Sequence, residues 1–285
     1  MRDAGAALGA AVHGVAEIGF ALRDGATRLS HLYQHDPLRV LFPRPVPGDL
    51  PTAAVVTTSG GLVAGDRIEM RVQLAAGAAA HVTASAADKI YRSTGPTTRV
   101  DQILRLDPGA RLEFLPPETI VFDGARLRRK TVVELAQGVG FLGGGIIVFG
   151  RRARGESFTQ GLLREVWEVR RDGHLAWGDA LHIDGDVVAV MADPACFDNA
   201  AACATLLLAP PRHDPRALID DARAVQARSA APGLRGGTTI VGGLLVARWL
   251  GHDPLALRRA YADLACHLRA AALGLPPRLP PLWHV

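Results

Sequence analysis

The sequence contains few cysteines and few aromatic residues. Its cysteines are Cys196, Cys203 and Cys266. An odd and sparse set argues against a disulfide framework and favours a reducing compartment. Aromatic residues make up 5% of the 285 residues, while hydrophobic residues make up 48%. The apolar area must therefore come mainly from Ala, Val, Leu and Ile, which is enough for a chain of this length to build a large core.

Long apolar segments are also missing. No stretch reaches the roughly 18 uninterrupted apolar residues that a membrane-spanning helix needs. The first residues, MRDAGAALGAAVHGVAE, are interrupted by an acid and a histidine, and no cleavage motif follows an apolar stretch. These absences predict a cytoplasmic protein that does not associate with a membrane.

The charge is moderately basic and is carried almost entirely by arginine. Lys and Arg number 32 against 28 Asp and Glu, and only Lys89 and Lys130 are lysines. Nucleic-acid binding would require clustered basic residues with aromatic stacking partners. The densest basic run, residues 126–130, alternates like a strand and lacks aromatic residues. We expect no nucleic-acid partner, whereas protein partners remain open because arginine suits forked contacts to carboxylates at interfaces.

The first two thirds of the chain predict β-strands joined by turns. In residues 67–74, Ile68, Met70, Val72 and Leu74 alternate with polar residues, which is typical of a half-buried strand. Asp172-Gly173 separates two strand-like segments and predicts a hairpin. The further strands expected are residues 100–106, 111–115, 127–135, 141–150, 164–170, 174–182 and 187–191.

The last third has a different character. Asp214-Pro215 and Asp253-Pro254 both provide an N-cap residue followed by proline, which predicts two helices, over residues 215–228 and from 254 to Gly274. Residues 238–249 predict one strand or two, and the proline-rich end, residues 276–285, is expected to be extended. We expect a mainly β, single-domain chain with a β-rich body over residues 1–195 and a C-terminal part, 196–285, whose two helices pack on it. Alternating β and α units are absent, which excludes a doubly wound α/β fold.

Catalytic and metal-binding motifs are lacking as well. The sequence has neither a G-x-S-x-G nor an H-E-x-x-H motif. The glycine-dense residues 60–66 lack the following helix and the Lys of a phosphate loop, which favours a tight turn between strands. Cys196 and Cys203 match no zinc spacing, and His31 and His35, although at helical i, i+4 spacing, have no third ligand nearby. We expect no enzyme, with two alternatives left open: a β-rich hydrolase whose triad is assembled from distant residues, or a binding module for another metalloenzyme.

Four ordered stretches resemble one known family. They are GGLVAGDR (60–67), DKIYRS with Gly95 (88–95), GARLEFLPPETIVF (109–122), and GR…GE followed by RDG between residues 150 and 173. Their types and order are similar to those of the UreD (UreH) family of urease accessory proteins. The resemblance implies a stacked, helicoidal β-sheet architecture with about two C-terminal helices.

The resemblance also implies a function. A member of this family would act as a nickel-insertion chaperone that binds apo-urease together with UreF and the GTPase UreG. No cofactor would be bound permanently, and nickel would be in transit. This fits a sequence without a metal motif, since oxygen ligands hold transition ions more weakly than convergent His and Cys sites do. The UreF contacts are expected on the C-terminal helices and tail.

We divide the candidate site residues into two groups. The candidate nickel-conduit acids are Asp66, Glu69, Glu113, Glu118 and Glu156. The alternative roles are turn capping for Asp66 and salt bridging for the others. The motif residues with expected structural or interface roles are Gly61, Gly65, Lys89, Tyr91, Arg92, Phe122, Gly150, Arg151 and Gly155.

Overall fold

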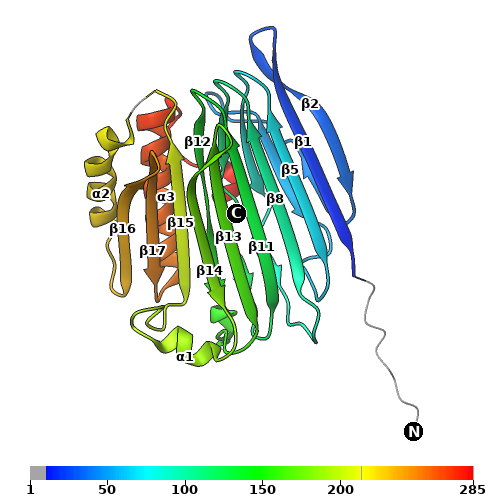
Figure 1. The fold of residues 1–285 in the computed structure, drawn as a ribbon, viewed down its shortest axis with the longest axis vertical. Coiled ribbons are helices and arrows are strands. Elements are labelled where there is room, and N and C mark those ends of the chain that lie inside the picture. Colours follow the sequence, from blue (N-terminus) through cyan, green and yellow to red (C-terminus); the bar gives the residue numbers. More distant parts are fainter. Residues whose placement is uncertain (1–10, 213, 285) are drawn as a thin grey trace.

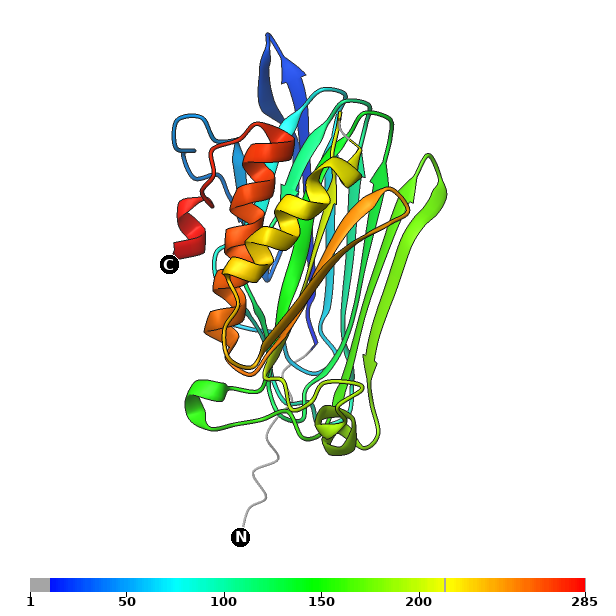
Figure 2. The same cartoon turned by 90° about the vertical axis from the view of Figure 1, so that its left-hand side faces the viewer.

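Two stacked β-sheets with helices on one side make up the protein (Figures 1 and 2). The computed structural model describes residues 11–212 and 214–284. The interpretation of residues 1–10 as lacking a secretion signal lies outside the described residues, as does Val285.

Sheet A has seven strands in the order β14-β13-β11-β8-β5-β1-β2. Their bounds are β1 (His13–Arg23), β2 (Ala26–His35), β5 (Arg67–Leu74), β8 (Thr98–Leu106), β11 (Arg126–Leu135), β13 (Leu162–Arg171) and β14 (His174–Ile183). The five strands from β13 to β1 run parallel, and antiparallel β14 and β2 form the two edges.

Sheet B has a main path of eight strands, in the order β16-β17-β15-β12-β9-β6-β4-β3. Their bounds are β3 (Leu38–Leu41), β4 (Thr52–Thr57), β6 (Ala79–Ala84), β9 (Arg111–Phe114), β12 (Gly140–Phe149), β15 (Ala202–Ala209), β16 (Leu234–Val241) and β17 (Leu244–Gly251). Two short strands, β7 (Asp88–Ile90) and β10 (Thr119–Val121), branch from the end of β12. Strands from both the expected body and the expected C-terminal part therefore share one sheet.

Stacked coils form the middle of the molecule, because the chain passes repeatedly from a strand of sheet A to one of sheet B. β5 leads to β6, β8 to β9 and β11 to β12, through turns that hold Gly77, Gly109 and Gly138. These glycines have φ of 71°, 70° and 67°, a region that side chains rarely adopt. The Gly77 N–H donates to Pro108 O at 3.1 Å, and the Gly109 N–H to Gln137 O at 3.1 Å. The turns therefore stack on one another just as the strands do.

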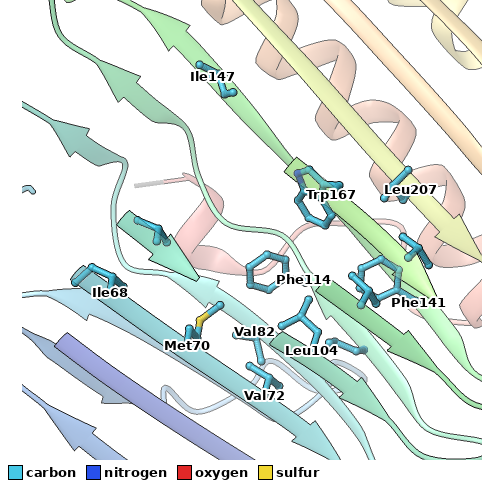
Figure 3. Packing of buried hydrophobic residues seen from close by; sticks show 14 of the residues in the cluster. Ile68, Met70, Val72, Val82, Leu104, Phe114, Phe141, Ile147, Trp167 and Leu207 are labelled. Atoms are coloured by element: carbon cyan, nitrogen blue, oxygen red, sulfur yellow. The ribbon is translucent and has the colours of Figure 1, made fainter. Parts of the chain in front are cut away.

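The hydrophobic core has two layers. The larger lies between the sheets, where side chains of β5 and β8 face those of β9 and β12 (Figure 3). The second lies between sheet B and two helices, α2 (Ile219–Arg228) and α3 (Pro254–Leu273), that cover its outer side (Figure 2). Tyr261 and Leu264 of α3 are fully buried in it. No helix among the described residues is both long and apolar enough to cross a membrane.

Most of the predicted elements are confirmed, as is the mainly β stacked fold. Asp253 caps α3 by accepting a hydrogen bond from the Leu255 N–H, and Gly274 ends it in a left-handed conformation. Asp214 caps a short 3-10 turn (Pro215–Leu218) that leads into α2. The segment 238–249 forms parts of two strands, divided at Gly242 and Gly243.

Two expectations about local structure are wrong, and one strand was not predicted. Residues 187–191 form helix α1 (Val187–Ala192) instead of a strand, because the Asp186 side chain accepts from the Ala189 N–H and caps the first turn. Strand β15 was not expected, since six of its eight residues are buried and it lacks alternation. The C-terminal end is not extended throughout: a 3-10 turn (Pro281–His284) places the buried Trp283 against the core.

The close packing of β15 and α3 against β12 depends on one glycine. A Cβ on Gly144 would lie 2.0 Å from Thr205 O and 2.9 Å from the Tyr261 hydroxyl, whereas a Cβ on Gly145 would meet nothing within 4 Å. We expect Gly144→Ala to lower the free energy of unfolding by about 1–3 kcal/mol or more, the usual cost of overpacking. Gly145→Ala should change it by less than about 1 kcal/mol. Urea denaturation of both variants measures this, and equal stabilities would contradict the assigned contact.

Candidate functional site

A short parallel ladder at one corner of the molecule gathers the family-like stretches. Leu62 bridges to Ile90, β7 pairs with β10, and β10 pairs with residues 147–149 of β12. Segments far apart in the sequence therefore lie side by side. We call this set the motif corner; it comprises Gly61, Lys89, Tyr91, Arg92, Glu118, Phe122, Asp123, Gly150, Arg151, Gly155 and Glu156.

Aromatic and glycine contacts build the centre of the motif corner. A Cβ on Gly61 would lie 2.5 Å from the Tyr91 ring and 2.8 Å from Lys89 O, so only glycine fits there without a shift. The Tyr91 hydroxyl donates to Gly60 O at 3.2 Å, and its ring meets the Phe122 ring edge-on with centroids 4.9 Å apart. The Arg151 guanidinium lies 4.6 Å from the Phe122 centroid. These contacts hold the centre of the motif corner together.

Two acids of the motif corner, Asp123 and Glu156, join neighbouring segments through hydrogen bonds. Asp123 accepts from the Thr159 N–H and Gln160 N–H at 2.8 and 3.1 Å, and from Arg92 at 3.2 Å. Burial raises the pKa of Asp123, but the hydrogen bonds from Thr159 and Gln160 outweigh it and hold the pKa below the usual value. Glu156 accepts from Arg151 at 2.5 Å and from the Asp123 N–H at 3.1 Å. The Arg151 hydrogen bond lowers the pKa of Glu156.

Two glycines allow the chain around Glu156 to turn. Gly150 has φ of 85°, and a Cβ there would lie 2.5 Å from Glu156 O. Gly155 has φ of 74° and ends a 3-10 turn (Arg152–Arg154) whose three residues are exposed. This turn and the residue before it therefore carry Arg151, Arg152 and Arg154 into solvent next to the motif corner.

A groove of about 610 Å³ opens between the motif corner and the start of α3. Its floor is apolar, with Ile120, Phe122 and Val148, and its rim carries Lys89, Arg151, Arg152, Arg154 and Arg258. The two acids at the rim are engaged: Glu118 pairs with Arg258 at 2.9 Å, and Asp253 caps α3. We call this feature the basic groove. Leu255, which is 51% exposed, lies at its edge.

The remaining conduit candidates lie elsewhere, so the five acids do not line one path. Asp66 is buried in the turn before β5, where its carboxylate accepts from the Val12 and Val63 N–H groups at 3.0 and 2.8 Å. This is the turn-capping role weighed for it above. Gly65, in the same turn, has φ of 85°. Glu69 lies on the outer face of sheet A and pairs with Arg67, Arg71 and His13.

Glu113 belongs to a fully buried ionic network between sheet B and α3. It pairs with Arg269 at 2.5 Å, and Arg269 also reaches Asp49 at 3.0 Å. His81 Nδ1 lies 3.3 Å from the other Glu113 oxygen, without hydrogen-bond geometry. Burial raises the pKa of Glu113, but His81 and Arg269 together bring it below 4.5. Glu113 therefore fastens α3 to the sheets.

A polar cluster inside the sandwich was not predicted. Arg129 donates to Glu165 at 2.7 Å and to the Thr119 hydroxyl at 2.8 Å, and a cavity of about 50 Å³ beside it is lined by Asp88 and Gln102 among apolar residues. Burial raises the pKa values of Asp88 and Glu165. A signal was present in the sequence, because Gln102, Arg129 and Glu165 each occupy an inward position of an otherwise alternating strand.

Neither the hydrolase alternative nor the histidine pair gains support. Among the described residues, no hydrogen bond joins a serine or cysteine to a histidine, and Ser157 accepts from Arg152. His31 and His35 lie on β2, not on a helix, where His31 contacts Glu17 at 3.1 Å and His35 contacts backbone carbonyls. Within residues 11–212 and 214–284, no group of three His, Cys, Asp or Glu side chains could hold a metal ion.

The fold and the motif corner define the class of protein: two stacked β-sheets, with sequence motifs from separate segments packed together at one corner of the surface. The model of the UreD urease accessory protein family matches residues 12–284. A protein named urease accessory protein UreD from Magnetococcus marinus is 42% identical over 96% of this chain and 94% of its own length. Proteins of the same name from Methylobacterium sp. strain 4-46 and Rhodopseudomonas palustris strain BisA53 are 41% and 37% identical, over 91% and 95% of this chain and 89% and 92% of their own lengths. The chain belongs to the UreD family.

The Arg269 network gives a stability prediction. Arg269→Met would leave Asp49 and Glu113 without their buried partner, and we expect it to lower the free energy of unfolding by about 3–5 kcal/mol. Arg278→Met is the control: Arg278 also contacts Asp49, at 3.4 Å, but is half exposed, so its loss should cost no more than about 1 kcal/mol. Chemical denaturation at neutral pH compares the two variants, and equal losses would contradict the role assigned to Arg269.

Acid denaturation should report on the same network. Because the folded-state pKa of Glu113 is depressed, its contribution is fully present above its unfolded value of about 4.5 and is lost as pH falls through the lower folded value. Glu113→Gln should therefore flatten the dependence of stability on pH below about 4.5. An unchanged acid limb in this variant would show that Glu113 is not coupled to folding.

Proposed function

We propose that this chain is a non-catalytic adaptor of urease maturation. It binds apo-urease in the cytoplasm together with UreF and the GTPase UreG, and it aids the delivery of nickel to the urease active site. Membership of the UreD family carries the proposal, since the curated relatives are named urease accessory proteins. The motif corner supports it, because its aromatic, acidic and glycine residues hold a surface in place and leave no nucleophile paired with a base.

The basic groove is the surface we assign to UreF. It joins the motif corner to the start of α3, which agrees with the expectation that the C-terminal helices contact UreF. An apolar floor with a charged rim is the usual arrangement of a protein interface. The tail is a poor candidate for a free binding segment, because the Trp283 indole donates to Leu115 O at 2.8 Å and stacks on Tyr261.

Nickel delivery is the second part of the proposal. The carboxylates of the five candidate acids accept hydrogen bonds from backbone amides or form ion pairs with arginines or histidines. Each would therefore have to release a partner before it could contact a passing ion. Asp88 and Glu165 join them as candidates, because they lie inside the sandwich and Asp88 lines its small cavity. Carboxylate oxygens bind transition ions weakly enough for transfer. No resident metal is needed for this role.

Coexpression of the urease subunits and the other accessory proteins, with and without this chain, tests the function. We expect equal amounts of urease protein in both cases, with little nickel and little activity when the chain is omitted. Nickel per urease active site, measured by elemental analysis of purified urease, is the readout. Equal nickel content and activity in both cases would refute the proposal.

The same coexpression system tests the conduit. Single Asp→Asn or Glu→Gln changes at the seven acids keep side-chain size but remove the charge. At least one should lower the nickel content while the variant still purifies with UreF. Unchanged loading in all seven variants would remove the conduit and leave the adaptor role standing.

A matched pair of surface changes tests the assignment of the groove to UreF. Leu255 and Val188 are 51% and 56% exposed, but Leu255 borders the basic groove whereas Val188 lies on α1. Leu255→Ser should weaken UreF binding by about tenfold, the effect of losing one well-packed apolar contact. Val188→Ser should leave the affinity unchanged. Equal affinities for the two variants would exclude the groove as the UreF contact.

A further inference from the structure

One row of residues on the outer face of sheet A is entirely basic. The register pairs Arg67 with Arg99, Arg99 with Arg128, and Arg128 with Arg164, so four arginines occupy the same level of four adjacent parallel strands. The row continues to His13 on β1 and His182 on β14. It crosses sheet A near the starts of its parallel strands, at the end where β1 begins in Figure 1. We call it the arginine row.

The other rows of this face differ in charge. One row further along the strands, Glu69 and Asp101 stand beside Lys130. Acids and bases of this row and of the two rows beyond form ion pairs, namely Glu17 with Arg71, Lys130 and Arg170 with Glu168, and Arg105 with Glu134. Basic composition alone therefore does not account for the arginine row, since the same sheet neutralises its arginines elsewhere.

The arginine row is unneutralised across most of its width. Arg67 pairs with Glu69 at 3.0 Å, but Arg99, Arg128 and Arg164 form no ion pair with any described residue. Arg99 and Arg128 are exposed, and Arg164 is partly exposed. Like charges on directly opposed strand positions destabilise a sheet. The fold thus carries a repulsive row that an external anion would relieve.

We propose that the arginine row binds an extended acidic segment of a partner protein. Adjacent strands lie about 4.8 Å apart, so the four arginines span about 14 Å. Carboxylates at alternate positions of an extended segment are about 6.6 Å apart, and three of them span about 13 Å. Arginine forks also suit carboxylates. This surface is separate from the basic groove and does not depend on nickel delivery.

The neighbouring row restricts the kind of ligand. Glu69 and Asp101 occupy the row next to the arginines. A ligand wider than one line of anionic groups would therefore place negative charge against these two carboxylates and be repelled. A duplex or an anionic bilayer presents a broader charged surface. The row contains only arginine and histidine, without the aromatic stacking partners that single-stranded nucleic acid requires. A narrow acidic peptide is the ligand that satisfies both conditions.

A peptide-binding measurement with the purified full chain tests the proposal. The probe is a fluorescent decapeptide of alternating Glu and Thr, with the Gln-Thr peptide as its neutral counterpart. The row variant is Arg99→Gln, Arg128→Gln and Arg164→Gln. The control variant is Arg71→Gln, Arg105→Gln and Arg170→Gln, which removes the same charge from the same face but from residues already paired.

The expected result is saturable binding of the Glu-Thr peptide at low salt, weakened at least tenfold in the row variant and less than twofold in the control. Thermal denaturation is the second readout, because removing the repulsion should raise the melting temperature of the row variant and removing paired arginines should lower that of the control. Absence of binding, equal weakening in both variants, or a row variant no more stable than the native chain would overturn the proposal. Tighter row-dependent binding of oligothymidylate or of phosphatidylserine vesicles would overturn it as well. None of these outcomes bears on urease activation, which the coexpression assay measures separately.

Discussion

The in-register stacking of parallel strands is the constraint on which the rest of the structure depends. Backbone hydrogen bonds hold equivalent positions of successive coils at the same level, so a side chain in one coil lies beside its counterpart in the next. The same constraint builds the motif corner, where Leu62, β7, β10 and β12 form one ladder. It also places three glycine turns above one another. One turn of the coil thereby brings distant positions to the same level. Examples are Arg99 beside Arg128, and Arg128 beside Arg164.

Both faces of sheet B are covered by other parts of the protein. One face packs on sheet A, and the other receives α3. Thr205 O of β15 and the Tyr261 hydroxyl of α3 together leave no room for a side chain at Gly144. The Arg269 network then fixes α3 by charge within an otherwise apolar layer. Removal of one partner from such a buried network is strongly destabilising, because it leaves the other charge without compensation. Here the network joins the helix, sheet B and the segment that holds Asp49.

The sequence predicted the strands where polar and apolar residues alternate, and both C-terminal helices from their Asp-Pro pairs. Asp253 caps α3 directly, whereas Asp214 caps the 3-10 turn that leads into α2. The sequence did not predict β15, because both faces of this strand are buried and its sequence does not alternate between polar and apolar residues. It also predicted a strand at α1, where the helix cap by Asp186 overrides the β preference of the valines. The motif residues were recognised, but their gathering into one corner depends on the coil register, which periodicity does not reveal. Asp66, Glu118 and Glu156 were chosen as conduit acids by their position in motifs, and Glu69 by its place on the polar face of a strand. The structure separates Asp66, Glu69 and Glu113 from Glu118 and Glu156. The inward polar residues Gln102, Arg129 and Glu165 could have been noticed, because each interrupts an apolar face.

The separation in sequence of the Arg269 partners has a consequence for biosynthesis. Arg269 lies 156 residues after Glu113 and 220 residues after Asp49. During translation, both carboxylates emerge from the ribosome long before the guanidinium that neutralises them. Sheet B of the nascent chain therefore lacks its charge partner and its helical cover until α3 has been synthesised. Premature termination before α3 would yield a polypeptide with this layer open, a natural target for cellular quality control.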